Sequence, residues 1–312
     1  MTMATCAAYW DYDFDDFDLE ESELRFDLDE VDNNYVLSFS TFTKMIDMAE
    51  YGQSQMKEHQ RYSRIVDDSG WRGTTTFEEA IALARHGWPE GANRLKAKLD
   101  ILQDLLPPQR VKPQILMSVV GPGTVDIGRY IAQHPEPWIT YQEVEVEDSG
   151  EVIAVAFNVG VSADVSTERM FQRGAVACVL IDALEQLGKR VELTVVKGTS
   201  SIPYGPYGAT NLVIKTIIKE ANSPLDIGRL VFAVAHASYL RRLCFSLEEQ
   251  LEKRLRNALG VTEDGNYGYS ISVDMPNSIN IAISKLQEGY TDIQLKQWIM
   301  QQLASLEKES AW

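Results

Sequence analysis

The sequence predicts an α/β fold, in which helices cover both faces of an open, mostly parallel sheet. Three observations support this prediction. After residue 113, segments with the pattern of buried strands alternate with helical segments. Residues 170–187 form a helical segment that is apolar almost all round between Ala175 and Leu184, as expected of a helix enclosed between layers. The chain has 312 residues and is 45% apolar, which suits a globular protein with a large core.

A small helical segment precedes the predicted sheet. From Ser40 onward, apolar residues fall at helical spacing. Thr76 to Glu79 has the form of a capping box, in which a hydroxyl and a carboxylate bind the first free backbone amides, and Gly87 suits the end of that helix. Pro89 fits the first turn of the next helix. The predicted domains are an acidic aromatic arm (1–38), this helical segment (39–110) and an α/β domain (111–312).

Strand and helix patterns then follow one another to the end of the chain. The predicted strands are residues 114–120, 138–146, 151–160, 191–196, 211–218 and 267–273. The predicted helices are residues 124–134, the long helix capped by Ser166, a region from Ser223 to about Leu259 with a break near residues 236–238, and a terminal helix from Thr291. Turn residues at 148–150 separate the strands at 138–146 and 151–160, so we expect these two strands to form a hairpin.

The net charge of −17 is concentrated near the N-terminus. Residues 9–33 contain twelve acids and one base, a net charge of −11, which leaves −6 for the other residues. An acidic field repels phosphate, so nucleic acid is not an expected partner of the arm. Aromatic rings alternate with the acids, a pattern that suits docking on a basic protein surface, although a solvated leader without a partner has the same composition. The expected contact residues are Trp10, Tyr12, Phe14 and Phe17.

Cysteine usage and hydropathy predict a cytoplasmic protein. Cys6, Cys178 and Cys244 are widely spaced and form no Cys-x-x-Cys pair, which indicates neither a disulfide framework nor a zinc site. No basic leader with an apolar run opens the chain, and no stretch of about 18 apolar residues occurs, so we expect neither secretion nor contact with a membrane. The predicted location is the cytoplasm. If the chain is phage-encoded, we expect it in the cytoplasm of the host or in the virion.

We expect no catalytic residues. His236 lies beside Ser238 on an apolar helical stretch, but a hydrolase needs a nucleophile held within hydrogen-bond reach of its base. Neither Ser238 nor Cys244 lies in a nucleophile elbow or a cysteine-protease signature. Cys178 and Cys244 are expected to be small core residues.

Two further clusters are candidates for contacts. Residues 204–208 form a loop rich in Gly, Pro and Tyr, and no basic residue lies between Lys197 and Lys215, so Tyr204 and Tyr207 are expected to contact protein rather than bases. A basic cluster and its interspersed acids predict a salt-bridged helix face. That face comprises Arg241, Arg242, Lys253, Arg254 and Arg256 with Glu248, Glu249 and Glu252.

Residues 152–196 resemble the start of a von Willebrand factor A-type domain, with a buried strand, a hydroxyl-rich loop, a buried helix and a second strand. In that family the loop carries Asp-x-Ser-x-Ser, which binds a divalent ion, usually Mg²⁺, through oxygen ligands. Here the motif falls on Asn158, Gly160 and Ser162, so Ser162 alone matches. The resemblance implies a Mg²⁺ site at Asn158, Ser162, Asp164 and Ser166. This site is the alternative to our main expectation, which is a protein that binds no cofactor.

A second resemblance is carried by Trp88 to Gly91, Pro224 to Asp226 and Arg241 to Leu243. With these residues the chain is similar to an uncharacterised family of tailed-phage and mobile-element proteins. We therefore expect a non-enzymatic, phage-related accessory or assembly protein that acts through protein contacts, homo-oligomers included. Two alternatives stay open: a metal- or nucleotide-dependent enzyme at the 158–166 loop, and an acidic DNA mimic that inhibits a basic host protein.

Overall fold

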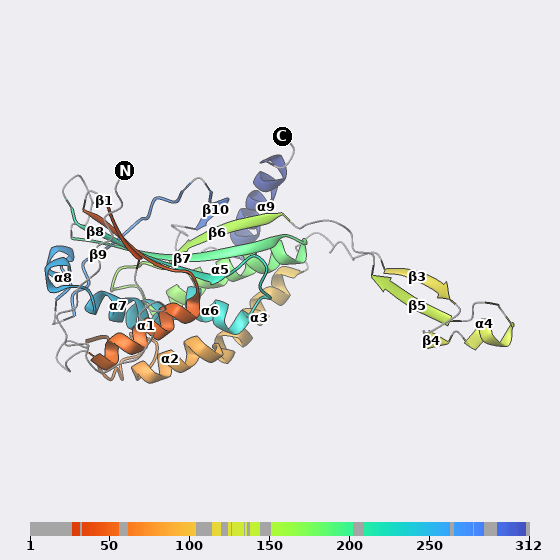
Figure 1. Cartoon of the computed structure of the whole chain (residues 1–312), viewed down its shortest axis with the longest axis horizontal. Coiled ribbons are helices and arrows are strands. Elements are labelled where there is room, and N and C mark those ends of the chain that lie inside the picture. The colour runs from red at the N-terminus through yellow and green to blue at the C-terminus, as the bar shows by residue number, and fades with distance from the viewer. Residues whose placement is uncertain are drawn as a thin grey trace.

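A computed structural model of the chain shows one large sheet with helices packed on it, and a second, small sheet (Figure 1). The structure describes residues 27–31, 33–55, 62–103, 114–119, 124–125, 127–133, 135, 138–143, 151–201, 209–262, 265–276, 278–283 and 292–309.

The strands of the large sheet are β1 (Asp27–Val31), β2 (Asn34–Phe39), β6 (Val152–Asn158), β7 (Arg190–Ser200), β8 (Asn211–Lys219), β9 (Tyr269–Ile271) and β10 (Ile281–Ile283). Their order is β1-β2-β8-β7-β6-β10, with β9 paired to β7. A parallel block of β10, β6 and β7 meets a parallel pair of β8 and β2 along an antiparallel contact between β7 and β8. The predicted α/β class and mostly parallel sheet are confirmed.

The helices of the main body are α1 (Phe42–Gln55), η2 (Tyr62–Arg64), α2 (Phe77–His86), α3 (Pro89–Gln103), α5 (Thr167–Gln186), α6 (Ile227–Ala235), η3 (Tyr239–Cys244), α7 (Phe245–Glu249), α8 (Lys253–Leu259) and α9 (Asp292–Glu309). In Figure 1, α1, α2, α5, α6 and α7 lie on one side of the sheet, and the chain between β9 and β10 crosses its other side. Within those residues, no single helix is long and apolar enough to cross a membrane.

Local sequence signals place several helix ends correctly. The Thr76 hydroxyl accepts from the Glu79 amide at 3.1 Å, and the Ser166 hydroxyl accepts from the Arg169 amide at 3.3 Å, which confirms both predicted caps. The break near residues 236–238 is also confirmed, because α6 ends at Ala235. The start predicted at Ser223 is wrong: Asp226 caps α6 and accepts from the Arg229 amide at 3.0 Å.

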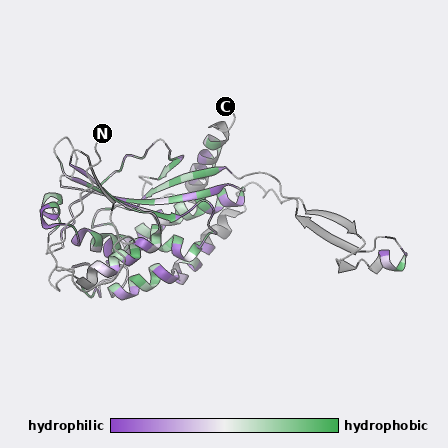
Figure 2. Cartoon of the chain, viewed as in Figure 1, coloured by the Kyte–Doolittle hydropathy of each residue, from purple (hydrophilic) through white to green (hydrophobic). Residues whose placement is uncertain are grey.

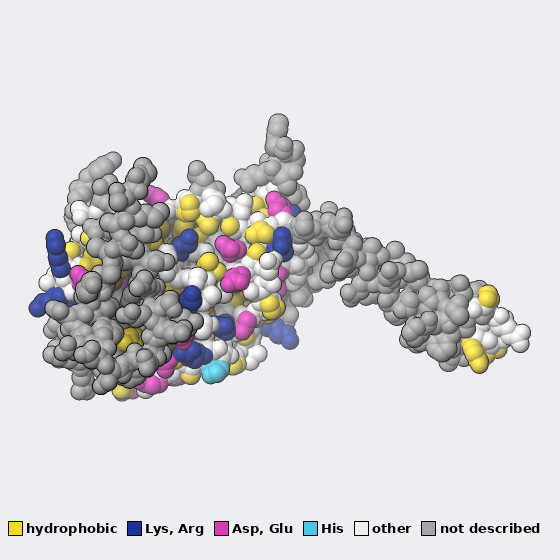
Figure 3. Space-filling model, in the orientation of Figure 1, with side chains coloured by type: hydrophobic (Ala, Val, Ile, Leu, Met, Phe, Trp, Pro, Cys, Tyr) yellow, Lys and Arg dark blue, Asp and Glu magenta, His cyan; other side chains and the backbone are white. Residues whose placement is uncertain are grey.

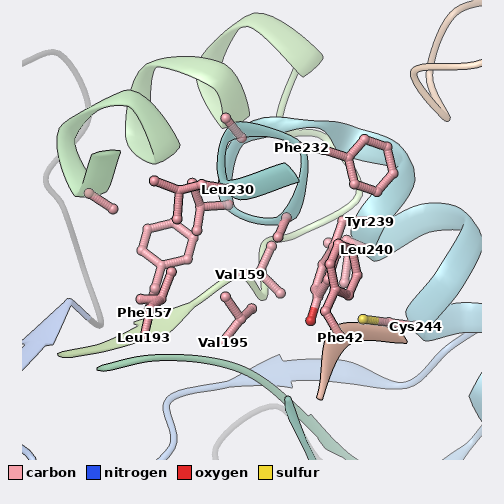
Figure 4. Packing of buried hydrophobic residues seen from close by; sticks show 14 of the residues in the cluster. Phe42, Phe157, Val159, Leu193, Val195, Leu230, Phe232, Tyr239, Leu240 and Cys244 are labelled. Carbon is pink, nitrogen blue, oxygen red and sulfur yellow. The ribbon is translucent and has the colours of Figure 1, made fainter. Parts of the chain in front are cut away.

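The core forms where α6 lies between the sheet and the other helices (Figure 4). Leu230 of α6 faces Phe157 and Leu193, which project from β6 and β7, and all three are at most 3% exposed. Consecutive residues of β6 and β7 are buried, as expected of strands in the centre of a sheet, and these strands are coloured mainly as apolar in Figure 2. Helix α5 encloses α6 from the other side. Buried residues occur along α5 from Met170 to Leu184, and this burial agrees with the prediction that the helix lies between layers.

The predicted boundaries at residues 38 and 110 do not separate folded units. β2 lies inside the predicted arm and pairs with β8, and residues of α1 and α2 share the core cluster with β6 and α6. Pairing between strands far apart in sequence leaves no local signal, so the pairing of β2 with β8 could not be predicted from the sequence.

The predicted hairpin is also wrong. Strand β5 (Trp138–Glu143) pairs with β3 (Gln114–Val119) and β4 (Thr124–Val125), and these three strands form the small second sheet. The short helix α4 (Ile127–Ile131) lies between β4 and β5 in the chain. β6, by contrast, pairs with β7 and β10 in the large sheet. Turn residues predict that the chain reverses, but not which strand it then joins.

Replacement of Gly174 tests the packing between α5 and α6. A Cβ atom there would lie 2.4 Å from the Val234 carbonyl oxygen and 2.5 Å from the Ala235 Cα, so even alanine forces two backbones apart. We expect Gly174→Ala to lower the free energy of unfolding by about 1–3 kcal/mol. Chemical denaturation measures this, with Gln172→Ala, an exposed position of α5, as the control. Equal stability of the two variants would contradict this close packing.

Candidate functional site

Two arginines of η3 are buried where the helices meet two loops. Arg241 and Arg242 are 1% and 0% exposed, and η3 is a π-helical turn, a conformation frequent at functional sites. Burial lowers the pKa of each guanidinium to about 10, so both stay charged at neutral pH. A buried charge needs hydrogen-bond partners to offset its lost hydration. These partners are backbone carbonyls of residues 62–75 and 159–166.

Arg242 ties the first loop together. Its Nη1 donates to the carbonyl oxygens of Ser63 and Ile65 at 2.7 and 2.8 Å. Its Nη2 donates to those of Thr74 and Thr75 at 2.7 and 2.9 Å. The planar fork of one guanidinium thus joins the start of the loop to its end, which a lysine ammonium is too small to do.

Arg241 joins the first loop to the second. Its Nη1 donates to the Trp71 carbonyl at 2.6 Å, and its Nη2 donates to the Val165 carbonyl at 2.5 Å. The Trp71 indole donates to the Ala163 carbonyl at 2.8 Å, and its ring lies 4.2 Å from the Arg241 guanidinium. Charge, hydrogen bonds and a cation–π contact therefore all fix one loop against the other.

Two buried carboxylates complete this framework. Burial by itself raises the pKa of Asp67, but hydrogen bonds from Ser69 and from the Arg72 amide outweigh it and hold that pKa below its usual value. Glu249 accepts from the amide and hydroxyl of Ser63 at 2.6 and 2.7 Å, and from the Tyr267 hydroxyl at 2.5 Å. The backbone of the first loop is thus held from inside by four charged side chains.

The outer side of these loops is exposed. We call the exposed part of residues 62–75 and 159–166 the two-loop surface. Ile65 and Val66 stand on it with 49% and 61% of their surface exposed, and Asp68, Ser162 and Asp164 are exposed as well. An apolar pair on a rigid, polar loop is an arrangement suited to contact with another molecule.

The predicted Mg²⁺ ligands lie in or beside the second loop, but their oxygens serve the fold. The Asn158 amide oxygen accepts from the Gly160 amide at 2.8 Å, and the Ser166 hydroxyl caps α5. Ser162 and Asp164 are exposed, which leaves one carboxylate in the set. The Asn158 and Ser166 oxygens are thus engaged within the fold, and no group of three or more His, Cys, Asp or Glu suited to a metal occurs among the described residues.

Guanidinium groups occupy the positions next to the loop's carbonyls where a cation is expected. Arg173 donates to the Asn158 carbonyl at 3.1 Å, and Arg241 donates to the Val165 carbonyl. These positive charges repel a divalent ion. The Mg²⁺ site therefore stays a prediction from the sequence, while the contacts that hold this loop in the structure come from the protein's own side chains.

The predicted partner contacts cannot be placed on this surface. Trp10, Tyr12, Phe14, Phe17, Tyr204 and Tyr207 all lie outside the described residues. Tyr269 of β9 lies opposite Ser200, the last residue of β7, and is 51% exposed.

The three candidate nucleophiles considered from the sequence that the structure describes, Ser238, Cys178 and Cys244, have structural roles. The Ser238 hydroxyl donates to the Arg72 carbonyl at 2.7 Å, while His236 Nδ1 accepts from the Ser238 backbone amide at 3.2 Å. The contact between Ser238 and His236 therefore involves the backbone amide of Ser238 and not its hydroxyl, so the two residues do not form a nucleophile–base pair. Cys178 and Cys244 are buried, and burial raises the pKa of each thiol above its usual value, so neither forms a thiolate near neutral pH. The prediction of core cysteines agrees with this burial.

The predicted salt-bridged helix face is wrong for its central residues. Glu248, like Arg241 and Arg242, is at most 1% exposed, and it accepts from Lys197 and from the Thr199 hydroxyl inside the protein. One signal for burial is present in the sequence, since Phe245 and Ser246 stand four residues after the two arginines and offer no acid for an i, i+4 pair. The 62–75 loop carries no comparable signal, and sequence reasoning missed it.

A cavity of about 170 Å³ lies elsewhere, between the ends of β2 and β8 and the starts of α1 and α6. Its lining includes two cations and two acids. Lys219 pairs with Glu185 at 2.8 Å, and Arg229 donates to the Thr43 hydroxyl at 3.2 Å. The two cations and two acids of this lining balance in number, so its net charge selects no ligand class.

Replacement of Arg242 tests the loop framework. Arg242→Met removes the donor of four carbonyl bonds, and we expect a loss of about 3–5 kcal/mol in unfolding free energy. Arg242→Lys should recover only a minor part, because an ammonium cannot span both ends of the loop. Urea denaturation measures both, with Arg254→Met at an exposed site of α8 as the control. Full stability of Arg242→Lys would show that charge alone holds the loop.

Replacement of His236 tests its buried environment. Its ring lies 4.4 Å from that of Trp88 and 5.1 Å from that of Phe232, and burial lowers its pKa from 6.5 to about 4. The unfolded chain then binds the proton more tightly between pH 4 and 6.5, so this contribution to stability, about 3 kcal/mol, is complete above pH 6.5 and lost as the pH falls to 4.

Denaturation of wild type and His236→Asn across this pH range measures the effect, and the variant should show a flatter dependence. His86→Gln, at an exposed position, should keep the wild-type slope. Identical slopes for wild type and His236→Asn would refute the assignment.

Comparison with known proteins identifies the family. No curated protein and no solved structure matches the chain. A family model described as "Domain of unknown function (DUF7192)" matches residues 19–308, which include both sheets, η3 and the two-loop surface. The chain therefore belongs to the DUF7192 family.

Proposed function

We propose that this protein is a non-enzymatic binding module that recognises another protein through the two-loop surface. The observation that carries the proposal is the pair of buried arginines whose guanidinium groups hold the backbone of residues 62–75 and 159–166 in one geometry. The exposed Ile65 and Val66 supply the apolar contact at its tip.

The cost of this framework supports a role in recognition. Each buried guanidinium loses several kcal/mol of hydration free energy. A surface loop does not need this costly arrangement for its stability, because turn residues alone can fix its backbone. A loop of fixed shape gains in binding, because less conformational entropy is lost when the partner docks. Buried charges beneath an exposed apolar tip are therefore expected where the loop has to be pre-organised.

A protein partner fits this surface better than a membrane does. The two adjacent β-branched side chains of Ile65 and Val66 suit an apolar pocket, and the two loops also expose the acidic side chains of Asp68 and Asp164. The whole chain carries −17, which opposes approach to anionic lipid. An accessory or assembly role in a phage-encoded system is consistent with such a module and stays a prediction from the sequence.

A photo-crosslinking amino acid at position 66 tests the proposal. Cells that express the full chain should yield one specific adduct at position 66 and none at position 152, where Val152 is also exposed, by 41%. The crosslinked protein is then purified, and its affinity is measured by calorimetry. Ile65→Ser/Val66→Ser should weaken binding by about tenfold or more at unchanged melting temperature, whereas Val152→Ser should not. Equal affinity of all three proteins would refute a role for the two-loop surface.

A further inference from the structure

One lysine of the large sheet lies inside the protein with few partners. On the face shown in Figure 3, the described Lys and Arg side chains lie at the surface among Asp and Glu, where water reaches them. Lys197 of β7, by contrast, is 4% exposed. Its Nζ donates to Glu248 Oε1 of α7, and the Phe245 ring lies 5.2 Å from Nζ. An ammonium has three N–H donors, and within the described residues Glu248 is the acceptor that this one has.

Glu248 is incompletely bound as well. Its side chain is 0% exposed, and the Thr199 hydroxyl donates to its Oε1 at 2.5 Å. Its Oε2 is buried and has no hydrogen-bond partner in the described part of the chain. Buried polar atoms without a partner are rare in folded proteins, and each one calls for an explanation. The Lys197–Glu248 pair therefore combines spare N–H donors with an unsatisfied carboxylate oxygen.

A second buried lysine shows the ordinary arrangement. Lys219 is 5% exposed, pairs with Glu185 at 2.8 Å, and donates to the carbonyl oxygens of Val191 and Glu220 at 3.0 and 3.3 Å. The side chain of Glu185 keeps 28% of its surface exposed. This ammonium thus has an acceptor for each of its three donors, and water reaches its carboxylate partner, as a lasting ion pair requires.

Condensation of the first pair would satisfy both of its groups. We propose that Lys197 and Glu248 form an intramolecular isopeptide bond, which links β7 to α7 covalently. The amide has one oxygen, Oε1, to which the Thr199 hydroxyl already donates, and it has a single N–H. The unpartnered Oε2 and the two buried charges are then gone. This bond does not depend on the two-loop surface or on any partner.

The reaction balances without an oxidant or a cofactor. One proton moves from Nζ to Oε2 and gives a neutral amine and a carboxylic acid, since burial removes the water that would stabilise the two charges. The amine lone pair forms a bond to Glu248 Cδ, while the Thr199 hydroxyl polarises Oε1. The bond from Cδ to Oε2 breaks, and Oε2 leaves as water with a second proton from Nζ. The fold holds the two groups in contact, and effective molarities of such intramolecular reactions reach about 10⁵–10⁸ M.

Mass spectrometry of the purified full chain in denaturant tests the proposal. An ion pair dissociates when the chain unfolds, whereas an amide persists. We expect an intact mass lower than that of the sequence by one water molecule. Proteolytic digestion should then yield one branched fragment that contains both residue 197 and residue 248. An intact mass equal to that of the sequence, or a loss of water located at other residues, would overturn the proposal.

The two buried lysines provide the matched variants. Lys197→Met removes the attacking amine, and its intact mass should equal that of its own sequence. Lys219→Met removes a lysine of similar burial that already has its acceptors, and this variant should keep the loss of one water molecule. A loss of water that persists in Lys197→Met would show that another group is modified, and the proposal would fail.

Discussion

Burial of two adjacent positive charges is the constraint on which the rest of this structure depends. Arg241 and Arg242 sit at the turn where α6 ends and α7 begins, between the core and the surface. Neither forms a close ion pair among the described residues. Both are instead neutralised by carbonyl dipoles, and only irregular backbone has carbonyls free for that purpose. The two loops are therefore as necessary to the helices as the helices are to the loops.

The same arrangement explains why the 158–166 loop differs from the metal-binding loop it resembles. A loop that gathers carbonyl and side-chain oxygens after a buried strand can be held by a cation. Here the cations are side chains, and Asn158 uses its amide to bind the loop internally. In this loop the positive charges near the carbonyl oxygens are the side chains of Arg173 and Arg241.

Much of the fold could be predicted from local chemistry. The cap at Thr76, the cap at Ser166 and the apolar α5 follow from hydrogen-bonding side chains and from periodicity, which act within a few residues. Strand partners could not be predicted, because β2 joins β8 and β5 joins β3 through contacts with no local signature. The site was missed for a related reason: the charge of Arg242 suggested solvent, and its four carbonyl partners come from residues far earlier in the chain.

The pairing of β2 with β8 has a consequence for how the chain matures. Asn34 and Asn211, whose side chains are hydrogen-bonded at 2.8 Å, are 177 residues apart. During synthesis β1 and β2 leave the ribosome long before β8 exists, so the first strands wait without the neighbour that completes their sheet. An acidic segment remains soluble through such a wait, because its charges repel other unpaired chains. The acidic charge of residues 9–33 is therefore expected to matter during folding as well as in the finished protein.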